Sequence, residues 1–160
     1  MKAEHVNAFL VPAVEVLQKM AGTKVTVGKV ARLDQDAGGS VDHHLSIIIG
    51  LRGRLSGSVI LTAARPVAVR LAGLIVKTAP EEVAEDDVRA IMAEVANTVV
   101  GNATVLLYDQ GIKAGITPPT VVLGPEVSFG FDAGVESVQI PLKTEAGEIT
   151  VVVSLTRETP

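Results

Sequence analysis

The residues with the clearest chemical potential in this sequence are a carboxylate and a carboxamide in the stretch EVANTVVGN, residues 94–102. Glu94 and Asn97 are three positions apart, so on a helix their side chains are neighbours, one turn apart. Ala90 and Gly101 flank the pair. Within a helix, Asn and Gly cost roughly 0.5 and 1 kcal/mol relative to Ala, and a solvated face would more often carry Lys, Glu or Gln. A polar pair framed by small residues is what a helix needs if the backbone of another protein must come close.

The polar pair belongs to a narrow face that is separate from the apolar stripe of the same helix. With roughly 100° per residue and Glu94 at zero, the face between about −60° and +20° holds Asp87, Ala90, Asn97 and Gly101. The stripe predicted to be buried lies at about 100–160°, with one member near 60°. Its residues are Val88, Met92, Val95, Val99, Leu106 and, near 60°, Ile91. The polar face is therefore either merely solvated or a site.

The hydrophobic pattern predicts two long helices, a shorter helix and several strands. The helices are expected over 4–21, 66–77 and about 83–109, and the middle one, apolar nearly all round, is expected to be buried. Pro12 should make the first helix start late or kink. Strands are expected over 24–33, 45–53 and 55–63, an extended segment over 116–122, a turn over 34–40, and a final hairpin over 137–155 that turns near 145–147.

The two halves of the sequence resemble each other. EVLQKMAG (15–22) and EVANTVVG (94–101) share Glu, Val and Gly at the same spacing, at an offset of 79 residues. The hairpin 51–62 resembles 141–152, with Gly57 matching Gly147 at an offset of 90. We therefore predict one domain over residues 1–160, of α/β (α+β) class. In it an αβββ unit is used twice with internal pseudo-two-fold symmetry, and the helices pack on an antiparallel or mixed sheet.

The composition argues against several classes of partner. Hydrophobic residues make up 48% and charged residues 20%, so the chain should fold. Aromatic residues are 2% and the net charge is −4, which argues against base stacking, nucleic-acid backbones and anionic membranes. There is no cysteine, and hence no disulfide, thiol nucleophile or cysteine metal ligand. The opening residues do not resemble a signal peptide, and the longest uncharged stretch, 95–108, is too short to span a bilayer. We expect a cytoplasmic protein.

Other candidate motifs favour structural interpretations. His43 and His44 are adjacent and would point to opposite faces of a strand, and the only other histidine is His5, so a zinc site is not expected. The glycine-rich segment 50–57 lacks the Gly-Lys-Ser/Thr ending of a P-loop and is better explained as a hairpin turn. The acidic run 81–87 suits the start of a helix.

The long helix resembles a known family. The segment DVRAIMAEVANTVVG resembles the signature of the CheC, CheX and FliY group of chemotaxis phosphatases. That signature is an acidic residue, then Glu-x-x-Asn on a long helix, then Gly four residues after the Asn. Here these positions hold Asp87, Glu94, Asn97 and Gly101. The CheX branch is the more similar, because the signature occurs in full only once and ITPPTVVLG (116–124) looks like the CheX segment after that helix. The opening helix is also similar, so the resemblance covers nearly the whole chain.

This resemblance implies hydrolysis of the aspartyl phosphate of a CheY-like response regulator. An acyl phosphate is already activated, so its hydrolysis needs a water held in line more than a strong base. Asn97 would position that water, since a carboxamide both donates and accepts hydrogen bonds. Glu94 would pair with a lysine of the partner, and Asp87, Ala90 and Gly101 would contact the partner. The chain would need no cofactor of its own, with Mg²⁺ held by the partner, and the family likeness suggests a homodimer.

The first-half copy departs from this pattern. Glu15 is followed by Gln18, whose amide would lie about one carbon too far out, so we expect that face to be inactive. One alternative function is a non-catalytic module of the same fold that docks on a response regulator or a flagellar-switch protein. Another is a structural protein whose polar face is only solvated. The presence of Asn97 as well as Glu94 favours catalysis, because docking alone would not require Asn.

Overall fold

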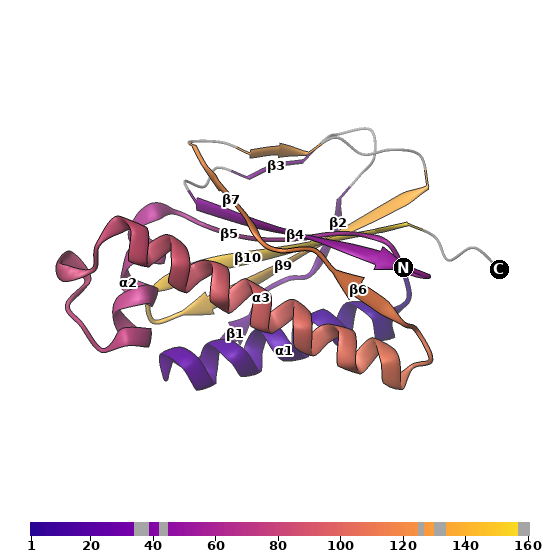
Figure 1. Cartoon of the computed structure of the whole chain (residues 1–160), viewed down its shortest axis with the longest axis horizontal. Helices are drawn as coiled ribbons and strands as arrows, with labels where there is room; N and C mark the ends of the chain where they lie inside the picture. Colours follow the sequence, from indigo (N-terminus) through magenta and orange to yellow (C-terminus); the bar gives the residue numbers. More distant parts are fainter. Residues whose placement is uncertain (34–38, 42–44, 125–126, 130–133, 157–160) are drawn as a thin grey trace.

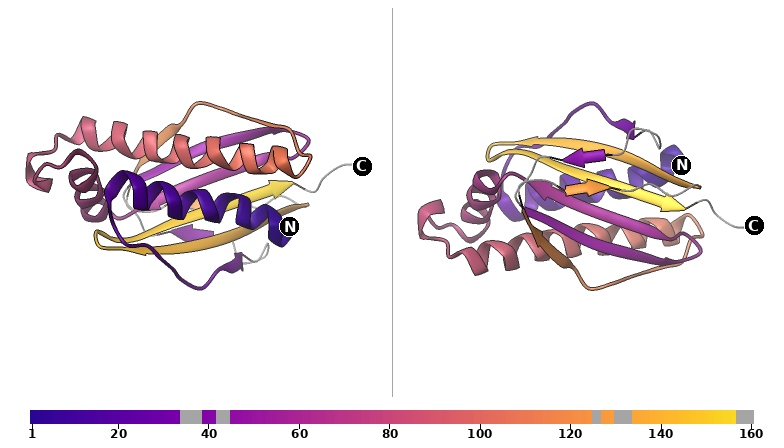
Figure 2. Two further views of the ribbon diagram at one scale, coloured as in Figure 1. Left: turned by 90° about the horizontal axis from the view of Figure 1, so that it is seen from below. Right: turned by 90° about the horizontal axis from the view of Figure 1, so that it is seen from above.

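Two long helices, α1 (Ala3–Ala21) and α3 (Glu85–Asp109), lie side by side across one face of a sheet (Figures 1 and 2). The computed structural model describes residues 1–33, 39–41, 45–124, 127–129 and 134–156. Helix α2 (Arg65–Val76) and the short 3-10 helix η1 (Pro80–Glu82) gather at one end of the molecule, beside the start of α3. The predicted set of two long helices and a shorter one is confirmed.

The sheet is antiparallel at every described pairing, which selects one of the two predicted arrangements. Its strand order is β1-β9-β10-β5-β4-β6, with β2 also pairing β9 and β7 pairing β4. A separate two-stranded pair, β3–β8, lies over the face opposite the helices (Figures 1 and 2). The bounds are β1 Thr26–Val27, β2 Ala31–Leu33, β3 Gly39–Val41, β4 Leu45–Gly53, β5 Gly57–Ala63, β6 Ala114–Ile116, β7 Thr120–Leu123, β8 Val127–Phe129, β9 Val135–Thr144 and β10 Gly147–Thr156.

The centre of the sheet joins the two halves of the chain. The hairpins β4–β5 and β9–β10 meet through the pairing of β5 with β10. In this pairing Leu61 lies opposite Val151. The two residues are 90 positions apart, which is the offset between the similar hairpins in the sequence. The offset does not hold for the outer strands of the hairpins. The turn between the paired residues Leu51 and Gly57 of β4–β5 has five residues (52–56), whereas the turn between Thr144 and Gly147 of β9–β10 has two (145–146). Because the first turn is three residues longer, β4 and β9 correspond at an offset of 93 and not 90.

The core between the helices and the sheet is aliphatic, with Phe9 as the one aromatic side chain among the described buried residues. On α3 the predicted stripe is buried at Val88, Met92, Val95 and Val99, while Leu106 and Ile91 are half-buried. The buried side is wider than the periodicity indicated. It also takes in Ala96, Val100, Ala103 and Leu107.

Helix α1 begins at Ala3, so the predicted late start at Pro12 is wrong. Proline removes one intrahelical hydrogen bond, and here that loss is offset because the ring is itself buried along with Phe9 and Ala13. The helix ends at Ala21 and is capped by Gly22, whose left-handed conformation (φ 62°) lets its N–H donate to the carbonyl of Gln18.

The predicted strand over 24–33 is broken into β1 and β2. Both pair with β9, but Gly28 lies against Pro141 between them, and a Cβ on Gly28 would come within 2.9 Å of the Pro141 ring. The Gly28 N–H donates to the Pro141 carbonyl at 2.8 Å, but Pro141 has no backbone N–H to donate in return, so the ladder is interrupted there. The predicted turn over 34–40 is wrong for Gly39 and Ser40, which belong to β3, and its other residues, 34–38, lie outside the described part of the chain.

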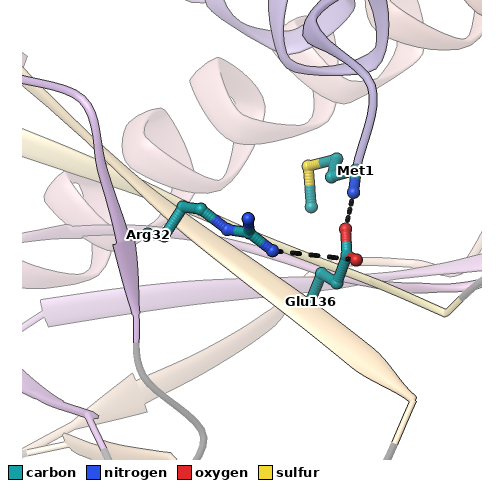
Figure 3. A network of polar contacts seen from close by, with 3 residues as sticks. All are labelled: Met1, Arg32 and Glu136. Carbon is teal, nitrogen blue, oxygen red and sulfur yellow. Dashed lines mark ion pairs between the residues drawn. The ribbon is translucent and has the colours of Figure 1, made fainter.

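The start of α1 is tied to the sheet through Glu136 on β9. Figure 3 shows the amino group of Met1 and the guanidinium of Arg32 converging on this carboxylate, with Arg32 at 3.7 Å. The Arg32 side chain is 77% exposed, so that second pair contributes little to stability. The nearby imidazole of His5 is buried, and its Nε2 has no hydrogen-bond partner among the described residues.

By length and composition, α3 could cross a membrane, and it is the one such helix in the described ranges. It is also the central core helix, packed against α1, α2 and the sheet. Core helices of globular proteins pass the same test, so this property carries no argument for a membrane span.

Candidate functional site

The candidate site is built on α3, a helix of 25 residues and therefore about 37 Å in length at about 1.5 Å per residue. Its first turn carries Glu85, Asp86 and Asp87, whose charges complement the helix dipole. It ends at Asp109 with Gln110 as its C-cap, and Gly111 follows with φ 83°. A rigid helix of this length can present several turns of side chains to one partner.

The structure places all five residues singled out from the sequence on the outward side of α3. Asp87, Ala90 and Glu94 are exposed, and Asn97 and Gly101 are half-buried. The residues that face α1 and the sheet lie on the opposite side of the helix. The polar face inferred from the periodicity therefore exists as one continuous surface.

The side chain of Asn97 makes no hydrogen bond with the described part of the chain. Its neighbour Thr98 behaves differently, because its Oγ1 donates to the Glu94 carbonyl at 2.8 Å and lies 3.4 Å from Glu94 Oε1. Asn is a poor helix former, and here neither capping nor internal bonding compensates. Its carbonyl oxygen and amide are both free to bind a molecule from outside.

Gly101 has no packing reason to be glycine in this fold. A Cβ built there would meet no atom of the described residues outside its own helix within 4 Å, and its backbone is not in the left-handed region. By contrast, a Cβ on Gly73 of α2 would come within 2.8 Å of the Thr78 carbonyl. The space above Gly101 is therefore open to solvent or to a partner.

The carboxylates of this face are not engaged by the protein's own cations. Arg65 pairs with Glu85 at 3.3 Å and Arg89 with Asp86 at 3.5 Å. Among the described residues no ion pair involves Asp87 or Glu94. Both charges are therefore available to a basic group of a partner.

Three further residues on this face were missed by the sequence reasoning. Thr98 contacts Glu94, and Val105 and Tyr108 continue the same side of the helix with 60% and 67% of their surface exposed. Positions 94, 98, 101, 105 and 108 repeat at intervals of three and four, and this spacing could have identified them. An exposed Tyr and Val beside an unpaired amide extend the surface available to a partner.

The first-half copy is placed differently. Glu15 and Gln18 are exposed on α1, but the helix ends at Ala21, three residues after Gln18. Helix α3 continues for twelve residues beyond Asn97, to Asp109. The outward face of α1 thus lacks the long extension that follows Asn97.

Within the residues described, no group of three or more His, Asp or Glu side chains is arranged to hold a metal ion. His43 and His44, weighed above as metal ligands, lie outside the described residues. The groups that this face presents are the amide of Asn97, the carboxylates of Asp87 and Glu94, and the hydroxyls of Thr98 and Tyr108.

Comparison with known proteins identifies related chains. The family model described as "Chemotaxis phosphatase CheX" matches residues 45–143, more than half of the sequence. The "CheY-P phosphatase CheX" of Thermotoga maritima is 26% identical over 133 residues, covering 81% of this chain and 84% of that protein.

Two solved structures share the fold. A CheC-like superfamily protein from Shewanella sp. PV-4 has a TM-score of 0.85 at 23% identity and covers 98% of this chain and 100% of its own. A CheX chain from Borrelia burgdorferi, solved as a CheX–CheY–BeF3–Mg²⁺ complex, has a TM-score of 0.77 at 23% identity, covering 96% of this chain and 98% of that one. At these identities the structural likeness carries the fold alone.

Proposed function

This chain belongs to the CheX family of chemotaxis phosphatases, and from that premise we propose that it hydrolyses the aspartyl phosphate of a CheY-like response regulator. The observation that carries the proposal is the outward face of α3. It presents Asn97 with no hydrogen bond to the described residues, beside an unpaired Glu94 and the open space at Gly101.

In the proposed mechanism Asn97 holds the attacking water. Its amide oxygen accepts a hydrogen bond from the water while its amide N–H₂ donates to a phosphoryl oxygen. The water oxygen bonds to phosphorus as the bond from phosphorus to the aspartate oxygen breaks. The regulator's carboxylate is restored, and the proton of the water leaves with inorganic phosphate. Most of the catalytic effect is positioning, because the acyl phosphate is already activated and its aspartate carboxylate is a good leaving group.

Glu94 has a docking role in this proposal. Its exposed carboxylate would pair with a lysine of the regulator and so align the helix with the phosphoryl group. Thr98 supports it, since its hydroxyl lies 3.4 Å from Glu94 Oε1 and restricts the carboxylate. Mg²⁺ would be held by the acidic pocket of the regulator, and this chain would supply no ligand to it. Asp87, Ala90 and Gly101 would contact the regulator around the pair.

The choice of a CheY-like partner is supported by relatives. The Thermotoga maritima protein is named a CheY-P phosphatase, and the Borrelia burgdorferi CheX was solved bound to CheY. We further propose that the chain acts in the cytoplasm and forms a homodimer. Light scattering on a size-exclusion column would test the oligomeric state.

The decisive experiment follows loss of phosphate from the CheY-type regulators of the source organism, each phosphorylated by acetyl phosphate. We expect wild type to accelerate the loss and Asn97→Ala to lower kcat by at least roughly 100-fold, the range for a group that positions a reactant. Glu94→Ala should act mainly on KM. Asn102→Ala is the matched control, because Asn102 is an exposed amide on the same helix but outside the face.

Each alternative has its own outcome. If no regulator loses phosphate faster with wild type, the phosphatase proposal fails. Binding without acceleration would identify the non-catalytic docking module instead. Acceleration that survives Asn97→Ala would leave the activity in place but contradict the role given to Asn97.

A further inference from the structure

A groove lies directly beside the proposed docking face, between the end of α2, η1 and the start of α3. Its volume is about 320 Å³. Val76, Val83 and Ile91 supply apolar surface, and Glu82 and Asp87 supply carboxylates. None of the described residues that line it is Lys or Arg.

The sequence pattern predicts that α2 is a buried helix, and this prediction is wrong for one of its sides. The groove exists because that side of α2 is exposed. The helix uses Ala68, Leu71, Ala72 and Gly73 against the core, whereas Leu74 and Val76 are 38% and 45% exposed. Exposing an aliphatic side chain forgoes the stabilisation that its burial would contribute. An apolar residue left at the edge of a groove is therefore a candidate for burial by a partner.

The wall formed by α2 is held firmly. Lys77 ends the helix in the left-handed conformation (φ 55°), and the Thr78 N–H bonds the Gly73 carbonyl at 3.0 Å. The returning chain passes so close to Gly73 that a Cβ there would lie 2.8 Å from the Thr78 carbonyl oxygen. The groove is thus preformed, which lowers the cost of filling it.

The groove is continuous with the α3 face, because Asp87 and Ala90 belong to both. Ala90 precedes Asn97 by seven residues, so the two are about 10 Å apart along the helix at about 1.5 Å per residue. A protein whose phosphoryl group reaches Asn97 therefore covers this groove as well, since a typical interface buries roughly 800 Å² on each partner.

We propose that this groove is a second contact for the response regulator, receiving an apolar side chain of that partner with a Lys or Arg beside it. The apolar lining favours the partner's apolar side chain, and the carboxylates of Glu82 and Asp87 favour its Lys or Arg. This assignment rests on the proposed function and specifies which surface of the partner is recognised. Val76 and Glu82 act in recognition and take no part in the hydrolysis itself.

The test compares Val76→Asp with Leu74→Asp. Both replace an exposed aliphatic residue of α2 by a carboxylate, but Leu74 does not line the groove. The probe is the Mg²⁺- and beryllofluoride-loaded CheY-type regulator, with binding measured by calorimetry. Loss of one buried Val side chain predicts a roughly ten-fold higher Kd for Val76→Asp, and we expect less than a two-fold change for Leu74→Asp. Turnover at saturating phosphorylated regulator should be unchanged in both variants.

A second variant tests the charge. Glu82→Gln should raise the Kd about two- to three-fold at low salt, with the difference vanishing in high salt, because rim charges act through a screened field. Circular dichroism of each variant establishes that it is folded.

Equal Kd values for Val76→Asp and Leu74→Asp would overturn the inference while leaving the phosphatase proposal intact. A Val76→Asp variant that binds normally but changes from dimer to monomer would overturn it too, by assigning the groove to a second copy of this chain. If the Kd values of wild type and the variants for the loaded regulator are as predicted, but wild type does not hydrolyse the phosphate of the phosphorylated regulator, only the proposed function would be refuted.

Discussion

Replacing Gly101 by Ala separates what this helix needs for folding from what it needs for a partner. Within the described part of the chain, a Cβ at this position meets no atom beyond its own helix within 4 Å, and the residue lies inside α3 with helical neighbours on both sides. Gly costs roughly 0.5–1 kcal/mol relative to Ala in a helix interior. Gly101→Ala should therefore stabilise the protein by about that amount and raise the Tm by roughly 1–4 °C for a chain of this size.

The same methyl group should impair phosphatase activity. It would project from the outward face between Asn97 and the exposed Val105, where the proposed partner has to approach closely. A misplacement of about 1 Å can cost roughly 100-fold in rate, so we expect kcat/KM to fall at least ten-fold. Stability would be measured by urea and thermal unfolding, and activity by phosphate release from the phosphorylated regulator.

The matched control is Asn102→Ala, the next residue along. It also replaces a poor helix former by Ala but lies outside the face, so it should stabilise the protein by roughly 0.5 kcal/mol and leave activity unchanged. A Gly101→Ala protein that keeps full activity would refute the idea that this space is reserved for a partner. A destabilised one would refute the packing argument.

Three further outcomes can be checked with the same assays. Met92→Ala removes a fully buried side chain from the core side of α3 and should lower the free energy of unfolding by about 2–5 kcal/mol in urea melts. Gly57→Ala should destabilise the protein severely or prevent its expression in soluble form, because φ is 152° and a Cβ would lie 1.9 Å from the Ser154 carbonyl oxygen. Gln18→Asn completes a Glu-x-x-Asn sequence on α1. It should raise phosphatase activity less than two-fold, because α1 ends three residues later. A larger gain in activity would contradict the importance given to the extension of α3.

Features that depend on local pattern were predicted correctly. The stripe of Val88, Met92, Val95 and Val99 repeats at helical spacing, and this repeat is sufficient to orient α3, because the apolar side of a helix turns to the core in any fold that buries it. The opposite side, with Glu94, was located at the same time. The roles assigned to Glu94 and Asn97 stay predictions, since geometry alone does not report turnover.

Features that depend on distant residues were not predicted. The break between β1 and β2 arises where Pro141, more than a hundred residues away, lies against Gly28. Pro12 was expected to delay α1, but its burial in the core keeps the helix continuous from Ala3. In both places the local signal was real, and a tertiary neighbour decided its effect.

By itself, the sequence determined which residues of α3 can be buried and which must face away, since the period of a helix is a local property. Only the tertiary structure decided which apolar residues remain uncovered. The side chains of Val76 and Val105 are as apolar as many core residues, yet they are 45% and 60% exposed, and Tyr108 is 67% exposed. Burial depends on what packs against a side chain, and that is set by the whole chain.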